Sequence, residues 1–225
     1  ESAEGKFKKV AFELASYAKK VAESLGTTVT AVTINAGDVS DLSKYGVDKV
    51  LKVNNDALTG FSARAYADVI KQAAQKEGAK VVVLSSTTDS IYLSSLVAIS
   101  LDAGFTSNVV GLPVSTNPFQ VKRTAFSNKA FTITEITTDI KVLGLAKNSY
   151  GIIENNVSLT EEDFNPTIDA ADFNVKVTSV EKSSGKVSIA DADIVVSGGR
   201  GLKGPENWGM IEELASVLGA ATACS

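Results

Sequence analysis

Three closely spaced glycines and two cations follow an apolar segment near the carboxyl end of the sequence. The run is Gly199-Arg200-Gly201-Leu202-Lys203-Gly204, and Pro205 comes directly after it. Glycine lets the backbone approach a ligand closely, and the free N–H groups at the start of a helix favour an anion. The guanidinium of Arg200 suits bidentate contact with phosphate. The stretch therefore predicts a phosphate-binding turn, with Gly199, Gly201 and Arg200 as candidate contacts.

The same run formally matches the G-x-G-x-x-G pattern of nicotinamide dinucleotide-binding domains. In that pattern the helix begins near the middle glycine, whereas Pro205 suits a first helical position and places the helix start after Gly204. The acidic residue expected roughly 20 residues further on is also missing, because residues 220–225 contain no carboxylate. An NAD-linked oxidoreductase is therefore a disfavoured alternative.

The stretch from Val195 to Lys203 resembles the FAD-binding domain of the electron transfer flavoprotein alpha subunit family. The match runs through Val195-Val196-Ser197-Gly198-Gly199-Arg200-Gly201-Leu202-Lys203 and Glu206-Asn207, and on to a helix containing Leu214-Ala215. In that family, the arginine of this loop and the serine that closes the next strand contact FAD. The resemblance therefore implies FAD contacts for Arg200 and Ser225.

Membership of such a family also implies a role and partners. The expected protein is an electron carrier, rather than an enzyme with its own substrate. It would form a heterodimer with a beta subunit and pass electrons from flavin dehydrogenases to a downstream acceptor. The family's FAD-binding domain continues for roughly another hundred residues, the size of a small domain. Residues 186–225 are thus expected to be the incomplete beginning of that domain, which would not hold FAD tightly alone.

Composition limits the other classes of function. The sequence of 225 residues is 44% hydrophobic, carries a formal charge of −4 and contains no histidine. The missing histidine excludes a Ser-His-Asp triad and His-containing zinc sites, so we expect no catalytic residues of this kind and no metal. The acidic balance gives no reason to expect nucleic acid as a partner. No segment is long enough for a membrane span, and no signal peptide is recognisable, so the cytoplasm is the expected compartment.

Helical and apolar segments alternate over the first hundred residues. Helices are predicted over residues 6–25, 61–77 and 93–103, closed by Gly26, Gly78 and Gly104, and strands over 28–34, 49–53 and 80–85. This order predicts an α/β fold with a mostly parallel, three-layer sheet, Rossmann-like and similar to the adenine nucleotide alpha hydrolases. Such a domain normally opens with a strand, and we expect that strand to be missing ahead of the first helix.

Further strands follow Gly104. They are predicted near residues 109–112, 119–123, 131–136 and 141–145, and two of them alternate polar and apolar residues, so one face is expected to be solvated. Residues 160–166 are typical of a surface loop, and 173–177 of a strand. The polar residues 182–186 form the best linker candidate. We therefore predict an amino-terminal α/β domain over residues 1–185 and the start of the FAD-binding domain over 186–225.

Three other features allow two interpretations each. The hydroxyl-rich turn 85–90 could bind phosphate, but helix capping is the favoured explanation. Trp208 could lie under a flavin ring, but a core anchor is favoured. Cys224 is expected to be a small buried residue in a strand. A stand-alone adenine-nucleotide-binding α/β module remains the main alternative to the flavoprotein.

Overall fold

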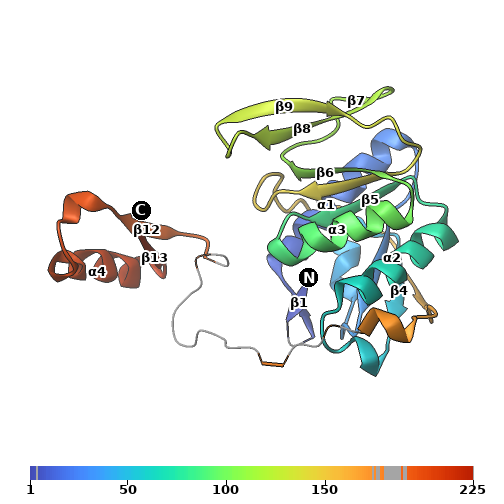
Figure 1. The fold of residues 1–225 in the computed structure, drawn as a ribbon, viewed down its shortest axis with the longest axis horizontal. Coiled ribbons are helices and arrows are strands. Elements are labelled where there is room, and N and C mark those ends of the chain that lie inside the picture. The colour runs from blue at the N-terminus through green and yellow to red at the C-terminus, as the bar shows by residue number, and fades with distance from the viewer. Residues whose placement is uncertain (4, 174, 176–177, 180–188, 190–191, 225) are drawn as a thin grey trace. The chain divides into compact units, whose positions relative to one another are not determined.

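The computed structural model describes residues 1–3, 5–173, 175, 178–179, 189 and 192–224. The chain divides into two compact units, Glu1–Val177 and Thr178–Ser225 (Figure 1). The predicted linker 182–186 and the predicted domain boundary after residue 185 lie outside the described residues, so the boundary remains a prediction.

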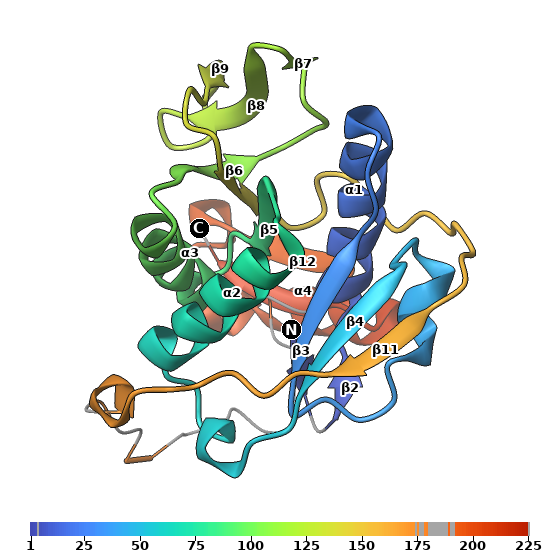
Figure 2. The ribbon, with the colours of Figure 1, turned by 90° about the vertical axis from the view of Figure 1, so that its right-hand side faces the viewer.

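The first unit is built on parallel strands in two sheets, and α1 (Lys9–Leu25), α2 (Ala63–Glu77) and α3 (Thr88–Ser100) pack on them. One sheet has the order β11-β4-β3, and Figure 2 shows these three strands side by side. The other has the order β5-β10-β6-β8-β7, with β9 paired to β8. The strands of the first sheet are β3 (Thr30–Ile34), β4 (Lys49–Val53) and β11 (Thr160–Asp163), all parallel. Those of the second are β5 (Val81–Ser85), β6 (Gly104–Val109), β7 (Ser115–Thr116), β8 (Phe119–Ala125), β9 (Ala130–Glu135) and β10 (Lys141–Leu145).

Apolar side chains of three helices cover these sheets. The helices are α1 (Lys9–Leu25), α2 (Ala63–Glu77) and α3 (Thr88–Ser100). Gly26 and Gly78 close the first two at φ 67° and 62°, left-handed values that glycine adopts without strain. Short 3-10 turns lie at Ser40–Lys44, Asp56–Leu58 and Ala170–Phe173. β1 (Ser2–Ala3) pairs with β2 (Lys6–Phe7) in antiparallel orientation. The α/β fold with a mostly parallel sheet is confirmed.

The third helix differs from its prediction at both ends. It was expected over residues 93–103 with Gly104 as its closing residue, but it begins at Thr88 and ends at Ser100. Asp102 takes the left-handed position at φ 50°, and the N–H of Ala103 bonds the carbonyl of Ala98 at 2.9 Å. This pattern closes a helix without glycine. Gly104 therefore starts β6.

The predicted loop at residues 160–166 is wrong over its first four residues. Thr160–Asp163 form β11, which pairs in parallel with β4. Its carboxylates meet lysines of neighbouring elements: Glu161 lies 3.0 Å from Lys52, and Glu162 lies 2.7 Å from Lys49 and 2.8 Å from Lys76. An edge strand can carry charged residues on its exposed side, so the polar sequence is compatible with a strand.

The strand predicted at 173–177 is not confirmed, because neither of the two described residues of this range, 173 and 175, lies in a strand. Phe173 ends the 3-10 turn Ala170–Phe173 instead, in which Asp169 accepts hydrogen bonds from the N–H groups of Ala171 at 2.9 Å and Asp172 at 3.0 Å. Residues 174, 176 and 177 lie outside the described residues.

The β8–β9 hairpin bears out the expectation of a solvated face. Phe131 and Ile133 of β9 are 62% and 51% exposed, whereas Phe119 and Val121 of β8 are buried.

Strands β4 and β10 have the predicted bounds.

Candidate functional site

Two parallel strands position the glycine-rich loop in the second unit. β12 (Val195–Gly198) leads into the loop, α4 (Gly209–Leu218) follows it, and β13 (Ala221–Cys224) pairs with β12 in parallel. Gly198 and Cys224 are direct partners in this pairing. Ligands of open α/β sheets bind beyond the carboxyl ends of the strands. The loop therefore leaves the sheet at the edge where a ligand is expected.

The loop is a succession of tight turns. Arg200–Leu202 and Pro205–Asn207 form 3-10 turns. Between them Lys203 has φ 66°, and the N–H of Gly204 bonds the carbonyl of Leu202 at 2.8 Å, the closure of a γ-turn. The side-chain amide of Asn207 donates to the same carbonyl at 2.8 Å. The α-helix starts after Gly204, as expected, but at Gly209; Pro205 opens the second 3-10 turn instead.

Gly198 and Gly201 differ in the space that surrounds them. A Cβ on Gly198 would lie 2.3 Å from Leu202 Cδ1 and 2.7 Å from Trp208 Cζ3, so packing within the unit requires glycine there. Trp208 thus packs against the end of β12, in agreement with its interpretation as a core anchor. Among the described residues, a Cβ on Gly201 would meet no atom within 4 Å, and the φ of Gly201 is not left-handed. Neither conformation nor packing requires glycine at 201, which leaves open backbone for a ligand to approach.

The two cations of the loop are available for an anion. Arg200 and Lys203 are both exposed, and neither has an ion-pair partner among the residues that the structure describes. Two exposed positive charges beside the first N–H groups of a helical turn suit a phosphate group.

Two other residues at this edge were predicted from the sequence. Ser225 lies outside the described residues, so its FAD contact remains a prediction. The expectation that Cys224 is buried is wrong, because the thiol is exposed. Among the described strands β13 pairs only with β12, so little covers its last residue.

Comparison with known proteins assigns both parts of the sequence. Residues 1–180 match the model of the electron transfer flavoprotein domain, and residues 188–225 match that of the electron transfer flavoprotein FAD-binding domain. The chain belongs to the electron transfer flavoprotein alpha subunit family. Electron transfer is therefore its role, and FAD is its cofactor.

Individual relatives support this assignment. The electron transfer flavoprotein subunit alpha of Thermoanaerobacterium thermosaccharolyticum is 30% identical over 235 residues, covering 100% of this chain and 71% of the relative. That of Clostridium acetobutylicum is 30% identical with 100% and 70% coverage, and that of Bacillus subtilis is 26% identical with 99% and 69% coverage. None of the described helices is long and apolar enough to cross a membrane.

The described loop fits FAD as a cofactor of this alpha subunit. Open backbone at Gly201 and the exposed cations Arg200 and Lys203 match the two phosphates of FAD in charge and in access. Bound FAD supplies the ring that takes up and releases electrons, while the protein supplies binding and electrostatics.

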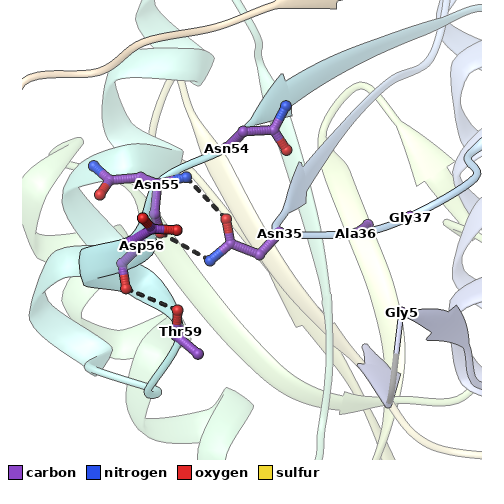
Figure 3. A pocket seen from close by; sticks show the side chains of 8 residues that line it. All are labelled: Gly5, Asn35, Ala36, Gly37, Asn54, Asn55, Asp56 and Thr59. Carbon is purple, nitrogen blue, oxygen red and sulfur yellow. Dashed lines mark hydrogen bonds between the residues drawn. The ribbon is translucent and has the colours of Figure 1, made fainter.

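A second group of polar residues lies in the first unit, and the sequence analysis missed it. A hollow of about 730 Å³ opens at the ends of β3 and β4 (Figure 3). Asn35 and Asn55 join its two loops: the Asn35 amide donates to the Asn55 carbonyl at 2.9 Å and accepts from the Asn55 N–H at 2.9 Å. The signal was present in the sequence, because polar residues follow both apolar strands. The lining residues are Gly5, Asn35, Ala36, Gly37, Asn54, Asn55, Asp56 and Thr59.

The hydroxyl-rich turn 85–90 has a different partner from the one predicted. Thr87 occupies the N-cap position of α3, but its side chain makes no capping hydrogen bond. Ser85 and Thr87 instead donate to the carboxylate of Glu1 at 2.8 and 2.7 Å. Burial opposes ionisation of Glu1, but the hydrogen bonds from Thr87 and Ser85 outweigh it and lower the pKa of the carboxyl. The capping explanation is therefore wrong, because these hydroxyls donate to the Glu1 carboxylate and, in the described part of the chain, no side chain caps α3.

Proposed function

We propose that this alpha subunit forms a heterodimer with a beta subunit and carries electrons from flavin dehydrogenases to a downstream acceptor. Gly199, Arg200, Gly201 and Ser225 are the proposed FAD contacts. The observation that carries the site is the loop itself, in which Arg200 is exposed without an ion-pair partner in the described part of the chain and Gly201 is open. The loop begins at the carboxyl end of β12, where α/β sheets bind ligands.

Arg200 has an electrostatic role in this proposal. A guanidinium stays protonated throughout the physiological range, so it holds a fixed positive charge at the loop. A fixed positive charge stabilises negative charge on any group in contact with it. Arg200 would therefore strengthen binding of the anionic cofactor, and it would raise the reduction potential if it lies near the flavin ring.

We further propose that residues 1–225 alone bind FAD weakly. Ligand sites usually bury most of the ligand surface between several elements. The described part of the second unit has two short strands and one α-helix, and its buried residues are Gly198, Ala215 and Ala221. Such a unit can contact FAD from one side only.

Visible absorbance during FAD titration tests the proposal. The chain of 225 residues and a subunit extended to the full length of the relatives are compared, each with and without co-expressed beta subunit. We expect stoichiometric flavin bands in the extended heterodimer and weak binding by residues 1–225. Absence of flavin from every preparation would contradict the proposed site. Tight, stoichiometric flavin on residues 1–225 would contradict the proposal that they bind weakly alone.

The hollow in the first unit favours a second candidate function, adenine-nucleotide binding. It lies at the carboxyl ends of parallel strands, and its Asn, Asp and Thr side chains can hydrogen-bond a base or a ribose. Calorimetry with AMP and ATP tests it, and heats equal to buffer dilution would remove this candidate.

A further inference from the structure

Lys203 has a backbone conformation that residues with a side chain rarely adopt. Its φ is 66° and its ψ is −45°, and around it the N–H of Gly204 bonds the carbonyl of Leu202 at 2.8 Å. A γ-turn with positive φ is rare and strained. Strain of this kind persists only where surrounding contacts hold it, and it clusters at functional sites. The contacts that hold Lys203 in this turn therefore bear on the function of the loop.

Asn207 bonds the residues on both sides of Lys203. Its side-chain amide donates to the Leu202 carbonyl at 2.8 Å, and its backbone N–H donates to the Gly204 carbonyl at 3.2 Å. The Leu202 carbonyl thus accepts two hydrogen bonds, which its two lone pairs allow. One closes the γ-turn, and the other connects the γ-turn to the 3-10 turn Pro205–Asn207. The Asn207 side chain therefore restrains the strained turn.

Rotation of the peptide between Leu202 and Lys203 would relieve the strain, because it changes the φ of Lys203. The carbonyl of this peptide accepts from Gly204 and Asn207, and its N–H donates to the Arg200 carbonyl at 3.1 Å. Because the carbonyl and the N–H of a trans peptide point in opposite directions, a flipped peptide would turn the carbonyl toward Arg200. That oxygen carries a partial negative charge, which repels a phosphate. Loss of the Asn207 hydrogen bond thus favours an orientation that opposes anion binding.

The two ends of the loop differ in their suitability for an anion. At one end, the N–H of Gly204 is bonded to Leu202. A Cβ on Gly204 would lie 2.3 Å from Oε2 of Glu206, so a carboxylate covers this backbone and repels an anion. At the other end, the N–H groups of Arg200 and Gly201 have no hydrogen-bond partner among the described residues. Consecutive N–H groups of this kind bind anions, so a phosphate suits the Arg200–Gly201 end.

We propose that Asn207 is a positioning residue for FAD that acts through the Leu202 carbonyl. Its hydrogen bond keeps this carbonyl turned away from the Arg200–Gly201 end, where the N–H groups can then bind a phosphate of the cofactor. The exposed ammonium group of Lys203 stays in the same turn. This inference rests on the proposed FAD contacts of Arg200 and Gly201.

A double-mutant cycle in the extended heterodimer tests this role. Asn207→Ala is made in the wild-type background and in a Lys203→Gly background, and FAD affinity is measured by titration. We expect Asn207→Ala to weaken FAD binding roughly tenfold in the wild type, because it removes the hydrogen bond that restrains the turn. In the Lys203→Gly background the same change should weaken binding less than about threefold, because glycine adopts positive φ without strain. Comparison within each background removes the effect of the lost Lys203 charge.

Hydrogen exchange measured before FAD is added gives an independent readout. In Asn207→Ala the N–H of Lys203 should exchange at least roughly threefold faster, because a rotated peptide no longer directs it to the Arg200 carbonyl. The N–H of Ala221, which bonds the Ile194 carbonyl at 3.0 Å, is the internal reference and should be unchanged. Asn207 is exposed, so its replacement should leave the second unit folded.

An equal loss of affinity in the two backgrounds would overturn the proposal, because a merely structural Asn207 would act in the same way whichever residue stands at position 203. Unchanged affinity of Asn207→Ala in the wild-type background, or unchanged exchange at Lys203, would also overturn it. Arg200→Gln separates these outcomes from failure of the proposed site. If Arg200→Gln weakens FAD binding and Asn207→Ala does not, only the positioning role is wrong; if neither weakens it, both are wrong.

Discussion

Gly198 and Cys224 are partners in a parallel pair of strands and end those strands together. Gly198 and Cys224 therefore lie at one edge of the sheet, although they are 26 positions apart in the sequence. Asn207 fixes the loop between them by donating to the Leu202 carbonyl at 2.8 Å. The candidate FAD site of this alpha subunit is thus set by strand register and one side-chain hydrogen bond.

Gly201→Ala tests whether the open backbone serves the cofactor. Because a Cβ at this position meets no atom of the described residues within 4 Å, we expect the free energy of unfolding to change by less than about 1 kcal/mol. FAD binding by the extended heterodimer should weaken roughly tenfold if the ligand approaches this backbone. Unchanged affinity would remove Gly201 from the site.

Gly198→Ala is the matched control with the opposite expectation. Its Cβ would lie 2.3 Å from Leu202 Cδ1, so the second unit should lose about 1–3 kcal/mol in its free energy of unfolding. Chemical denaturation followed by Trp208 fluorescence measures this loss. A stability equal to that of Gly201→Ala would show that the packing at the end of β12 is wrong.

Acid should weaken the attachment of β11. Hydrogen bonds from Lys49 and Lys76 lower the pKa of the Glu162 carboxyl to about 2. A carboxyl with a lower pKa in the folded state stabilises that state above its unfolded pKa, and loses this contribution as pH falls toward the folded value. We expect Glu162→Gln to lower the melting temperature at pH 7 and to approach the wild type near pH 2. Equal differences at both pH values would contradict the ion pairs.

Glu13 should be a major determinant of stability in the first unit. Its buried carboxylate accepts hydrogen bonds from the N–H groups of Asn148, Tyr150 and Gly151 at 2.9 to 3.0 Å. Glu13→Gln places an amide N–H₂ against one of these donors, so we expect a loss of about 3 kcal/mol in urea denaturation. Glu23→Gln on the exposed side of α1 is the control and should cost less than about 1 kcal/mol. Similar losses for both variants would contradict the role of Glu13.

The sequence predicts those elements that carry their own local signal. β4 and β10 are short apolar runs, and α1 and α2 are amphipathic helices closed by glycine, so their positions follow from residue type and spacing. β11 could not be found in this way. Its residues Thr160–Asp163 are polar, and they form a strand because lysines at positions 49, 52 and 76 lie beside them in the fold.

The site residues also differ in whether a local sequence pattern reveals them. The glycines and Arg200 can be recognised in the sequence because their order is unusual. Asn35 and Asn55 can be recognised as neighbours only in the fold, where two parallel strands bring them together. The hydroxyls of Ser85 and Thr87 suggested capping, and their actual partner, Glu1, is more than 80 residues away. Contacts at such separation leave no local pattern.

FAD titration of Arg200→Gln in the extended heterodimer tests the central claim most directly. Loss of a charged hydrogen-bonding group should weaken binding roughly tenfold or more, or lower the flavin reduction potential, with Lys20→Gln on α1 as the matched control. If Arg200→Gln and the wild type have the same dissociation constant and the same potential, the loop at Gly199–Gly204 is not part of the FAD site.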